Sequence, residues 1–206
     1  MRTSIYVDGL NLYYRCLRKS AFKWLDLNQL FSNLLDAKYK IDHINYYYAN
    51  VKSLPDDPSA PDRQGVYLRA IKTLNNVHLV QGDFTKRKVE MRLWSDPFAV
   101  VEVMKVEEKG SDVNLATNLL NDAWTDVYDV AFVVSQDPDL KEGMRLVKQE
   151  FPQKEVNLIT PGPRRKACKE LRDLADHHLE IRPKHLKNAQ FPDKLPAINI
   201  IKPPSW

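Results

Sequence analysis

Residues 4–12 read Ser-Ile-Tyr-Val-Asp-Gly-Leu-Asn-Leu, and this stretch decides the fold. Residues 5–7 favour a β-strand, because branched and aromatic side chains pack well on a pleated surface. Asp8 and Gly9 end the apolar run with a turn signal, and Asn11 is suited to cap a following helix. A buried strand with a carboxylate at its C-terminal end is typical of ligand sites in open α/β sheets.

The same arrangement recurs further along the chain. A second apolar run, Tyr128–Val134, leads into Ser135–Asp139, and between the two runs an acid stands at the mouth of a predicted helix in Glu107–Val113. The C-terminal ends of parallel strands meet at one edge of a sheet, so we predict that these acids lie close together. They are Asp8, Asp112, Asp137 and, beside the last, Asp139.

Such a cluster predicts a bound cation. Carboxylates roughly 4 Å apart repel each other by several kcal/mol unless a proton, a base or a metal ion lies among them. Oxygen ligands suit Mg²⁺ or Mn²⁺, and a metal-held water can attack phosphorus. Taken singly, each acid keeps a plainer explanation: Asp8 as a turn residue, Asp112 and Asp137 as acids favoured at helix N-termini.

The remaining sequence predicts alternating strands and helices, hence a parallel sheet with right-handed crossovers. Thr85–Trp94 and Phe98–Val106 interrupt this order with a β-hairpin insertion at about residues 84–107. The expected strands are Ile5–Val7, Ile44–Val51, Val77–Val80, Tyr128–Val134, Val156–Thr160 and Leu179–Ile181. Six helices are expected. One follows Asn11, one spans Asp26–Ala37 and one starts near Asp62. A fourth starts at Ser111 as its cap, a fifth starts at Pro138, and the last spans Arg164–Ala175.

Basic residues leave two interpretations open. Those of the hairpin and of residues 164–166 can follow a phosphate backbone or form a solvated charged face. Lys109 is the best single candidate, because only two residues separate it from Asp112. Tyr46–Tyr48 can stack on bases, although alternate residues of a buried strand more often lie in the core. The hairpin cations are Lys86, Arg87, Lys88 and Arg92, and the second group is Arg164, Arg165 and Lys166.

Composition sets broad limits. The 206 residues are 43% hydrophobic, enough for one well-buried domain, and the net charge of +4 permits a nucleic-acid partner without arguing for one. No apolar run approaches the roughly 18–20 residues of a membrane span, and Asp8 interrupts the N-terminal run, so no signal peptide is expected. With only Cys16 and Cys168, a reduced, cytoplasmic protein without a membrane partner is the simple expectation.

Three motifs together resemble the NYN domain, a branch of the PIN-like ribonuclease superfamily. They are Val7–Leu12, Lys109–Ala116 and Val134–Leu140, in the family's order. The resemblance implies a PIN-like three-layer α/β/α sandwich with a central parallel sheet over residues 1–182. It also implies a metal-dependent RNA phosphodiesterase site. The implied metal ligands are Asp8, Asp112 and Asp137, with supporting roles for Asn11 and Asp139.

The chain departs from the family pattern at three positions. Asn118 stands where a further acid is common, Gln136 replaces a glycine, and Leu140 replaces a phenylalanine. Asn118 removes one negative charge from the expected set. A non-catalytic RNA-binding or adaptor module of the same fold therefore stays open as an alternative.

Our main hypothesis is a Mg²⁺- or Mn²⁺-dependent ribonuclease acting on single-stranded or structured RNA. Asp8, Asp112 and Asp137 are its expected catalytic and metal-binding residues; Ser135 is expected to orient ligands, together with Asn11, Asp139 and Lys109. A phosphatase or nucleotidase acting on a small phosphate ester is a third option. Residues 183–206 form a proline-rich tail that we expect to be irregular and to lie over the surface or fray. A protein partner or a second copy of the chain stays open.

Overall fold

The structure, a computed structural model, describes residues 1–162, 168–196 and 199–206. Its centre is a seven-stranded sheet of order β4-β3-β2-β1-β5-β6-β7, parallel except for the antiparallel pair β3–β4. The predicted α/β class and parallel sheet are confirmed. The strands are β1 (Arg2–Asp8), β2 (Lys40–Ala49), β3 (Val77–Arg92), β4 (Val100–Lys109), β5 (Val130–Val134), β6 (Glu155–Pro161) and β7 (His178–Ile181).

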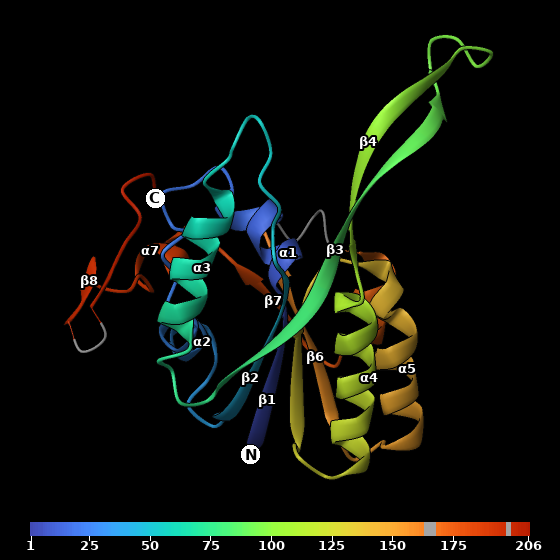
Figure 1. Cartoon of the computed structure of the whole chain (residues 1–206). Coiled ribbons are helices and arrows are strands. Elements are labelled where there is room, and N and C mark those ends of the chain that lie inside the picture. The colour runs from blue at the N-terminus through green and yellow to red at the C-terminus, as the bar shows by residue number, and fades with distance from the viewer. Residues whose placement is uncertain (163–167, 197–198) are drawn as a thin grey trace.

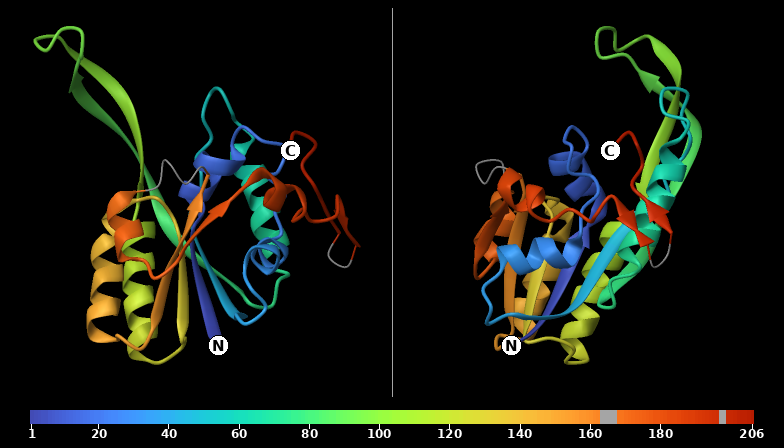
Figure 2. Two further views of the ribbon diagram at one scale, coloured as in Figure 1. Left: turned by 180° about the vertical axis from the view of Figure 1, so that it is seen from behind. Right: turned by 90° about the vertical axis from the view of Figure 1, so that its left-hand side faces the viewer.

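Helices cover both faces of the sheet (Figures 1 and 2). One face carries α1 (Gly9–Leu12), the π-helical η1 (Tyr13–Leu17), α2 (Leu27–Leu34) and α3 (Ala60–Ile71). The other carries α4 (Ser111–Trp124), the 3₁₀ turn η2 (Pro138–Leu140), α5 (Lys141–Glu150) and α6 (Lys169–Leu174). Each face has its own buried hydrophobic cluster, so the sheet is packed on both sides, as its apolar strands require.

The order of the strands reverses between β1 and β5. From β1 the chain moves outward to β2 and β3, and after the hairpin it returns to β5 on the other side of β1. Val7 pairs with Val134, so the two strands end at the same edge of the sheet. β1 and β5 are therefore neighbours, and their ends define a topological switch point.

The predicted β-hairpin is confirmed, and its first strand continues a strand of the sheet, because β3 runs through Gly82 without a break. β3 and β4 then leave the body as a two-stranded arm, clearly seen in Figure 1. Trp94 and Phe98, near its tip, are almost fully exposed.

Gly82 lies inside β3, and the packing around it requires a glycine. A Cβ there would come within 2.7 Å of Glu108 Oε1 and of Ser111 Oγ. The close approach of Glu108 and Ser111, and not a turn, explains why a glycine is needed here.

Two predicted helix caps are wrong. Asp8, and not Asn11, caps α1: its Oδ1 accepts a hydrogen bond from the Asn11 backbone N–H at 2.8 Å. Gly110, with φ of 94°, precedes α4, and Ser111 is its first residue. Asp8 is the cap because it lies directly at the strand-to-helix turn, where a side-chain oxygen can accept a hydrogen bond from the free backbone N–H groups of the first helical turn.

The tail is more ordered than predicted. It forms α7 (Pro183–Lys187) and the antiparallel pair β8 (Lys194–Leu195) and β9 (Ile200–Ile201). The Trp206 ring lies 6.4 Å from that of Trp24 and 5.8 Å from that of Tyr67, and Phe191 also packs on Trp24. Apolar residues spaced along the proline-rich segment therefore anchor it to the α2–α3 side of the body.

Candidate functional site

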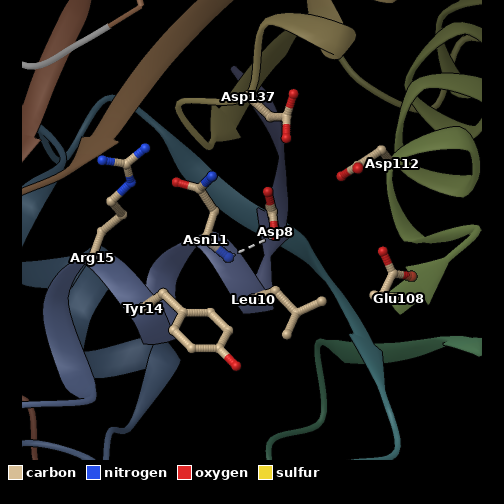
Figure 3. Close-up of a pocket in the computed structure, with 8 residues that line it drawn as sticks. All are labelled: Asp8, Leu10, Asn11, Tyr14, Arg15, Glu108, Asp112 and Asp137. Carbon is tan, nitrogen blue, oxygen red and sulfur yellow. Dashed lines mark hydrogen bonds between the residues drawn. The ribbon is translucent and has the colours of Figure 1, made fainter. Parts of the chain in front are cut away.

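A hollow of about 310 Å³ opens at the switch point, where β1 and β5 end. Figure 3 shows three carboxylates facing it, those of Asp8, Asp112 and Asp137, with Glu108 beside them. Asp8 ends β1, Asp137 follows β5, and Asp112 lies in the first turn of α4. The sequence predicted that these three acids meet, and the structure brings them to one hollow. The remaining lining residues are Leu10, Asn11, Tyr14 and Arg15.

Asp8 is the buried centre of this group. Its side chain is almost fully buried, with Oδ1 bonded to the Asn11 N–H and Oδ2 accepting the Ser135 hydroxyl at 2.8 Å. Burial raises its pKa, with smaller contributions from the Asp137 and Glu108 charges, while both hydrogen bonds oppose the rise. Gly9 permits this close packing, because a Cβ there would lie 2.6 Å from the Tyr47 carbonyl oxygen.

A hydrogen-bond network joins the ends of β1 and β5. The Ser135 hydroxyl donates to Asp8 and accepts from the Asp137 backbone N–H at 3.1 Å. Asn11 Oδ1 accepts from the Gln136 backbone N–H at 3.2 Å. Ser135 and Asn11 therefore hold the β5–η2 loop against α1. These contacts fix the position of Asp137 relative to Asp8.

Asp112 is the most perturbed acid of the hollow. Burial, followed by repulsion from Asp8, Asp137, Glu108 and Asp139, raises its pKa to about 7. No cation among the described residues pairs with it, and Gly110 gives the chain the left-handed turn that brings it to the hollow. An acid with a pKa near neutrality and no paired cation is a candidate for binding a metal ion or for exchanging a proton.

Glu108 was not singled out from the sequence. It lines the hollow, and its Oε1 accepts the Ser111 backbone N–H at 2.9 Å in the space that Gly82 leaves open. The sequence signal was weak, because Glu107 and Glu108 are adjacent acids and nothing in the local sequence distinguishes one from the other. Alternation along β4 separates them: Glu107 forms ion pairs with Arg87 and Lys105 of the arm.

Other predicted residues lie outside the hollow. Lys109 is exposed, with Nζ 3.9 Å from Glu107, and Asp139 is exposed with its N–H bonded to Asp137. Asn118 instead donates to the Tyr47 hydroxyl at 3.1 Å. Arg164, Arg165 and Lys166 lie outside the described residues. Tyr14 and Arg15 were missed, although they stand three and four residues after Asn11, the spacing of one helix face.

The donor set is chemically suited to a hard cation. All four acidic side chains offer oxygens, and Asp112 and Glu108 Oε2 have no hydrogen-bond donor among the described residues. Within the described part of the chain, no three His, Cys, Asp or Glu side chains form a ready-made cage for an ion. Mg²⁺ usually keeps several waters and takes only one or two protein carboxylates, so this set fits it.

The sheet, its helical layers and the acids at the switch point together define an α/β protein with an acidic site at the edge of its parallel sheet. The NYN domain family model matches residues 2–182, and the chain belongs to that family, a PIN-like nuclease family. Within the described residues, no helix is long and apolar enough to cross a membrane.

Two relatives add to this finding. The chain is 29% identical to 6-hydroxy-3-succinoylpyridine 3-monooxygenase HspA of Pseudomonas putida, over all of this chain and 75% of the relative. A crystal structure of a protein of unknown function from Vibrio parahaemolyticus has a TM-score of 0.58. It shares 19% identity, covering 92% of this chain and 96% of the other. The second likeness concerns the fold alone.

Proposed function

We propose that the protein is a metal-dependent ribonuclease whose active site is the acidic hollow. The observation that carries the proposal is the meeting of Asp8, Asp112 and Asp137 at the switch point of a NYN domain. Family membership supplies the nuclease class, and the uncompensated carboxylates supply a reason for a divalent cation. RNA as the substrate, and Mg²⁺ or Mn²⁺ as the cofactor, are parts of the proposal.

Each residue has a defined part in this reaction. Asp112 and Asp137 are the principal ligands, because each has carboxylate oxygen not engaged with another side chain and faces the hollow. Asp8 is oriented by Ser135 and the Asn11 N–H, so that it holds its position under the repulsion of its neighbours. A bound divalent ion supplies a water made more acidic and offsets charge on the phosphate.

The deciding experiment measures cleavage of labelled RNA and DNA oligonucleotides with Mn²⁺, with Mg²⁺ and with EDTA. Asp8→Asn is the test variant, since asparagine also serves as an N-cap and α1 is retained. Metal-dependent cleavage that is lost in the variant supports the proposal. Full cleavage by a folded Asp8→Asn protein refutes it. Binding of RNA without cleavage favours the adaptor module, and turnover of mononucleotides alone favours a phosphatase.

A second candidate rests on the relative that matches the whole chain. Its name describes a 3-monooxygenase that acts on 6-hydroxy-3-succinoylpyridine. The matching assay incubates the protein with 6-hydroxy-3-succinoylpyridine, oxygen and a reduced nicotinamide or flavin, and measures consumption of the pyridine and of the reductant. Consumption of both that is retained in EDTA and in Asp8→Asn would place the activity in this class and outside metal-dependent hydrolysis.

A further inference from the structure

The side of the hollow opposite the acids is built by η1. α1 continues into this π-helical turn, and Tyr14 and Arg15 project from it into the lining of the hollow (Figure 3). Short π-helical segments are uncommon and occur frequently at functional sites. The hollow thus has an acidic wall from β1, α4 and the β5–η2 loop, and a basic, aromatic wall from η1.

Tyr14 is an exposed ring held in a fixed orientation. The side chain is 57% exposed, yet the Tyr13 ring meets it edge-on at 5.4 Å, and the Arg18 guanidinium lies 5.4 Å from its centroid. A cation over one face and an aromatic edge against the ring restrict its motion. The rest of its surface stays open beside the hollow.

Arg15 carries a charge that no described residue neutralises. Neither Arg15 nor Arg18 forms an ion pair with any residue that the structure describes. On the arm, Arg87 and Lys105 pair with Glu107 and Lys88 pairs with Glu102, whereas Lys86 and Arg92 form no ion pair with a described residue. Arg15 lines the hollow together with the acids and none of the arm cations does, so Arg15 is better placed to bind a phosphate there than the arm cations that the sequence suggested.

We propose that Tyr14 and Arg15 form a nucleotide subsite for single-stranded nucleic acid. Arg15 binds a phosphate next to the one held at the acids, and Tyr14 stacks on the base between them. Stacking needs an unpaired base, so the subsite selects single strands over duplex. The inference rests on the proposed function for the position of the scissile phosphate, but binding tests it separately from cleavage.

The test measures binding of a fluorescent single-stranded RNA of roughly a dozen nucleotides by anisotropy, in EDTA so that nothing is cut. The same strand in a duplex is the competitor. Tyr14→Leu should weaken single-strand binding about tenfold, and Tyr14→Phe, which keeps the ring, should restore it. Arg15→Gln should lower the slope of log affinity against log salt by about 0.7. Arg87→Gln, on the arm, is the matched control and should change neither quantity.

The outcomes separate the subsite from the nuclease. Tyr14→Leu and Arg15→Gln proteins that bind like the unaltered chain, or duplex that competes as well as the single strand, overturn the subsite even if Mn²⁺-dependent cleavage is found. If only Arg87→Gln weakens RNA binding, the binding surface is the arm, and the proposed subsite is also overturned. Binding that depends on Tyr14 and Arg15 without any cleavage supports the subsite and refutes the nuclease.

Discussion

The two ends of β1 and β5 carry the same kind of residue in opposite electrostatic states. At their N-terminal ends, Arg2 lies 2.6 Å from Asp129 and 3.0 Å from Asp126, and buried Lys154 lies 2.7 Å from Asp126. Hydrogen bonds from Arg2 lower the pKa of Asp129 to about 2, and those from Lys154 and Arg2 lower that of Asp126.

At the C-terminal ends the acids face each other, and none of them forms an ion pair with a residue that the structure describes. There, burial and mutual repulsion raise the pKa of Asp8, and raise that of Asp112 to about 7. Folding alone selects paired acids, because an unpaired buried carboxylate opposes it. We therefore infer that the unpaired end binds a ligand and that the paired end serves stability. The following predictions test that division.

The largest expected effect is on cleavage. Asp112→Asn should reduce metal-dependent cleavage about 100-fold or more, because it removes a proposed ligand. The same change should leave the free energy of unfolding at neutral pH equal or higher, since it removes a repelled charge. Single-turnover cleavage and urea unfolding of the same preparation measure both. A loss of stability that accompanies the lost activity would contradict the division.

Asp129→Asn is the matched control at the other end. It should keep cleavage intact and lower the melting temperature by about 2–4 °C, the effect of losing about 1 kcal/mol in a chain of this size, because asparagine weakens the hydrogen bonds from Arg2 by removing the charge. Lost cleavage in a folded Asp129→Asn protein would show that the two ends are not functionally separate.

Metal binding should stabilise one end only. Because the acids repel each other in the metal-free protein, Mn²⁺ should raise the melting temperature of the unaltered chain, by an amount that grows with the logarithm of its concentration. Asp112→Asn should lose most of this rise, whereas Asp129→Asn should keep it. Differential scanning calorimetry with a Mn²⁺ series, against EDTA, measures the effect. An equal rise in all three proteins would place the ion elsewhere.

The two ends should respond to pH with opposite signs. Asp112 has a folded-state pKa of about 7, above its ordinary 3.8, so metal-free stability should fall as pH rises from about 4 to 7. Asp129 has a folded-state pKa of about 2, so its contribution is present above about pH 4 and is lost as pH falls toward 2. Urea unfolding across pH in EDTA should show that Asp112→Asn removes the first slope and Asp129→Asn the second.

The sequence predicted one end of the strands better than the other. Asp8 and Asp137 could be brought together because each follows an apolar run, and parallel strands end at one edge. Nothing local distinguishes Asp129 from them, since its partner Arg2 lies 127 residues away. Glu108 was missed for a similar reason: its place depends on the close approach of Glu108 and Ser111 to Gly82, which is distant from both in the sequence.

The smallest expected effect concerns Glu108, the fourth acid of the hollow. Glu108→Gln keeps an oxygen that can accept the Ser111 N–H but removes a charge that raises the pKa of Asp112. The slope of metal-free stability against pH should therefore shift to lower pH, and Mn²⁺ affinity should fall less than in Asp112→Asn. Glu107→Gln, one residue away but paired with Arg87 and Lys105, is the control.

Because glutamine preserves the hydrogen bond, any change in Glu108→Gln reports the charge and not the local structure. A pH profile that matches the unaltered chain would mean that Asp8 and Asp137 alone set the pKa of Asp112. A shift in Glu107→Gln of the same size would show that charges along β4 act at long range. A shift confined to Glu108→Gln would extend the unpaired acids of the hollow from three to four. Glu108 would then supply the fourth acidic group in place of position 118, where Asn118 donates a hydrogen bond to Tyr47 and does not line the hollow.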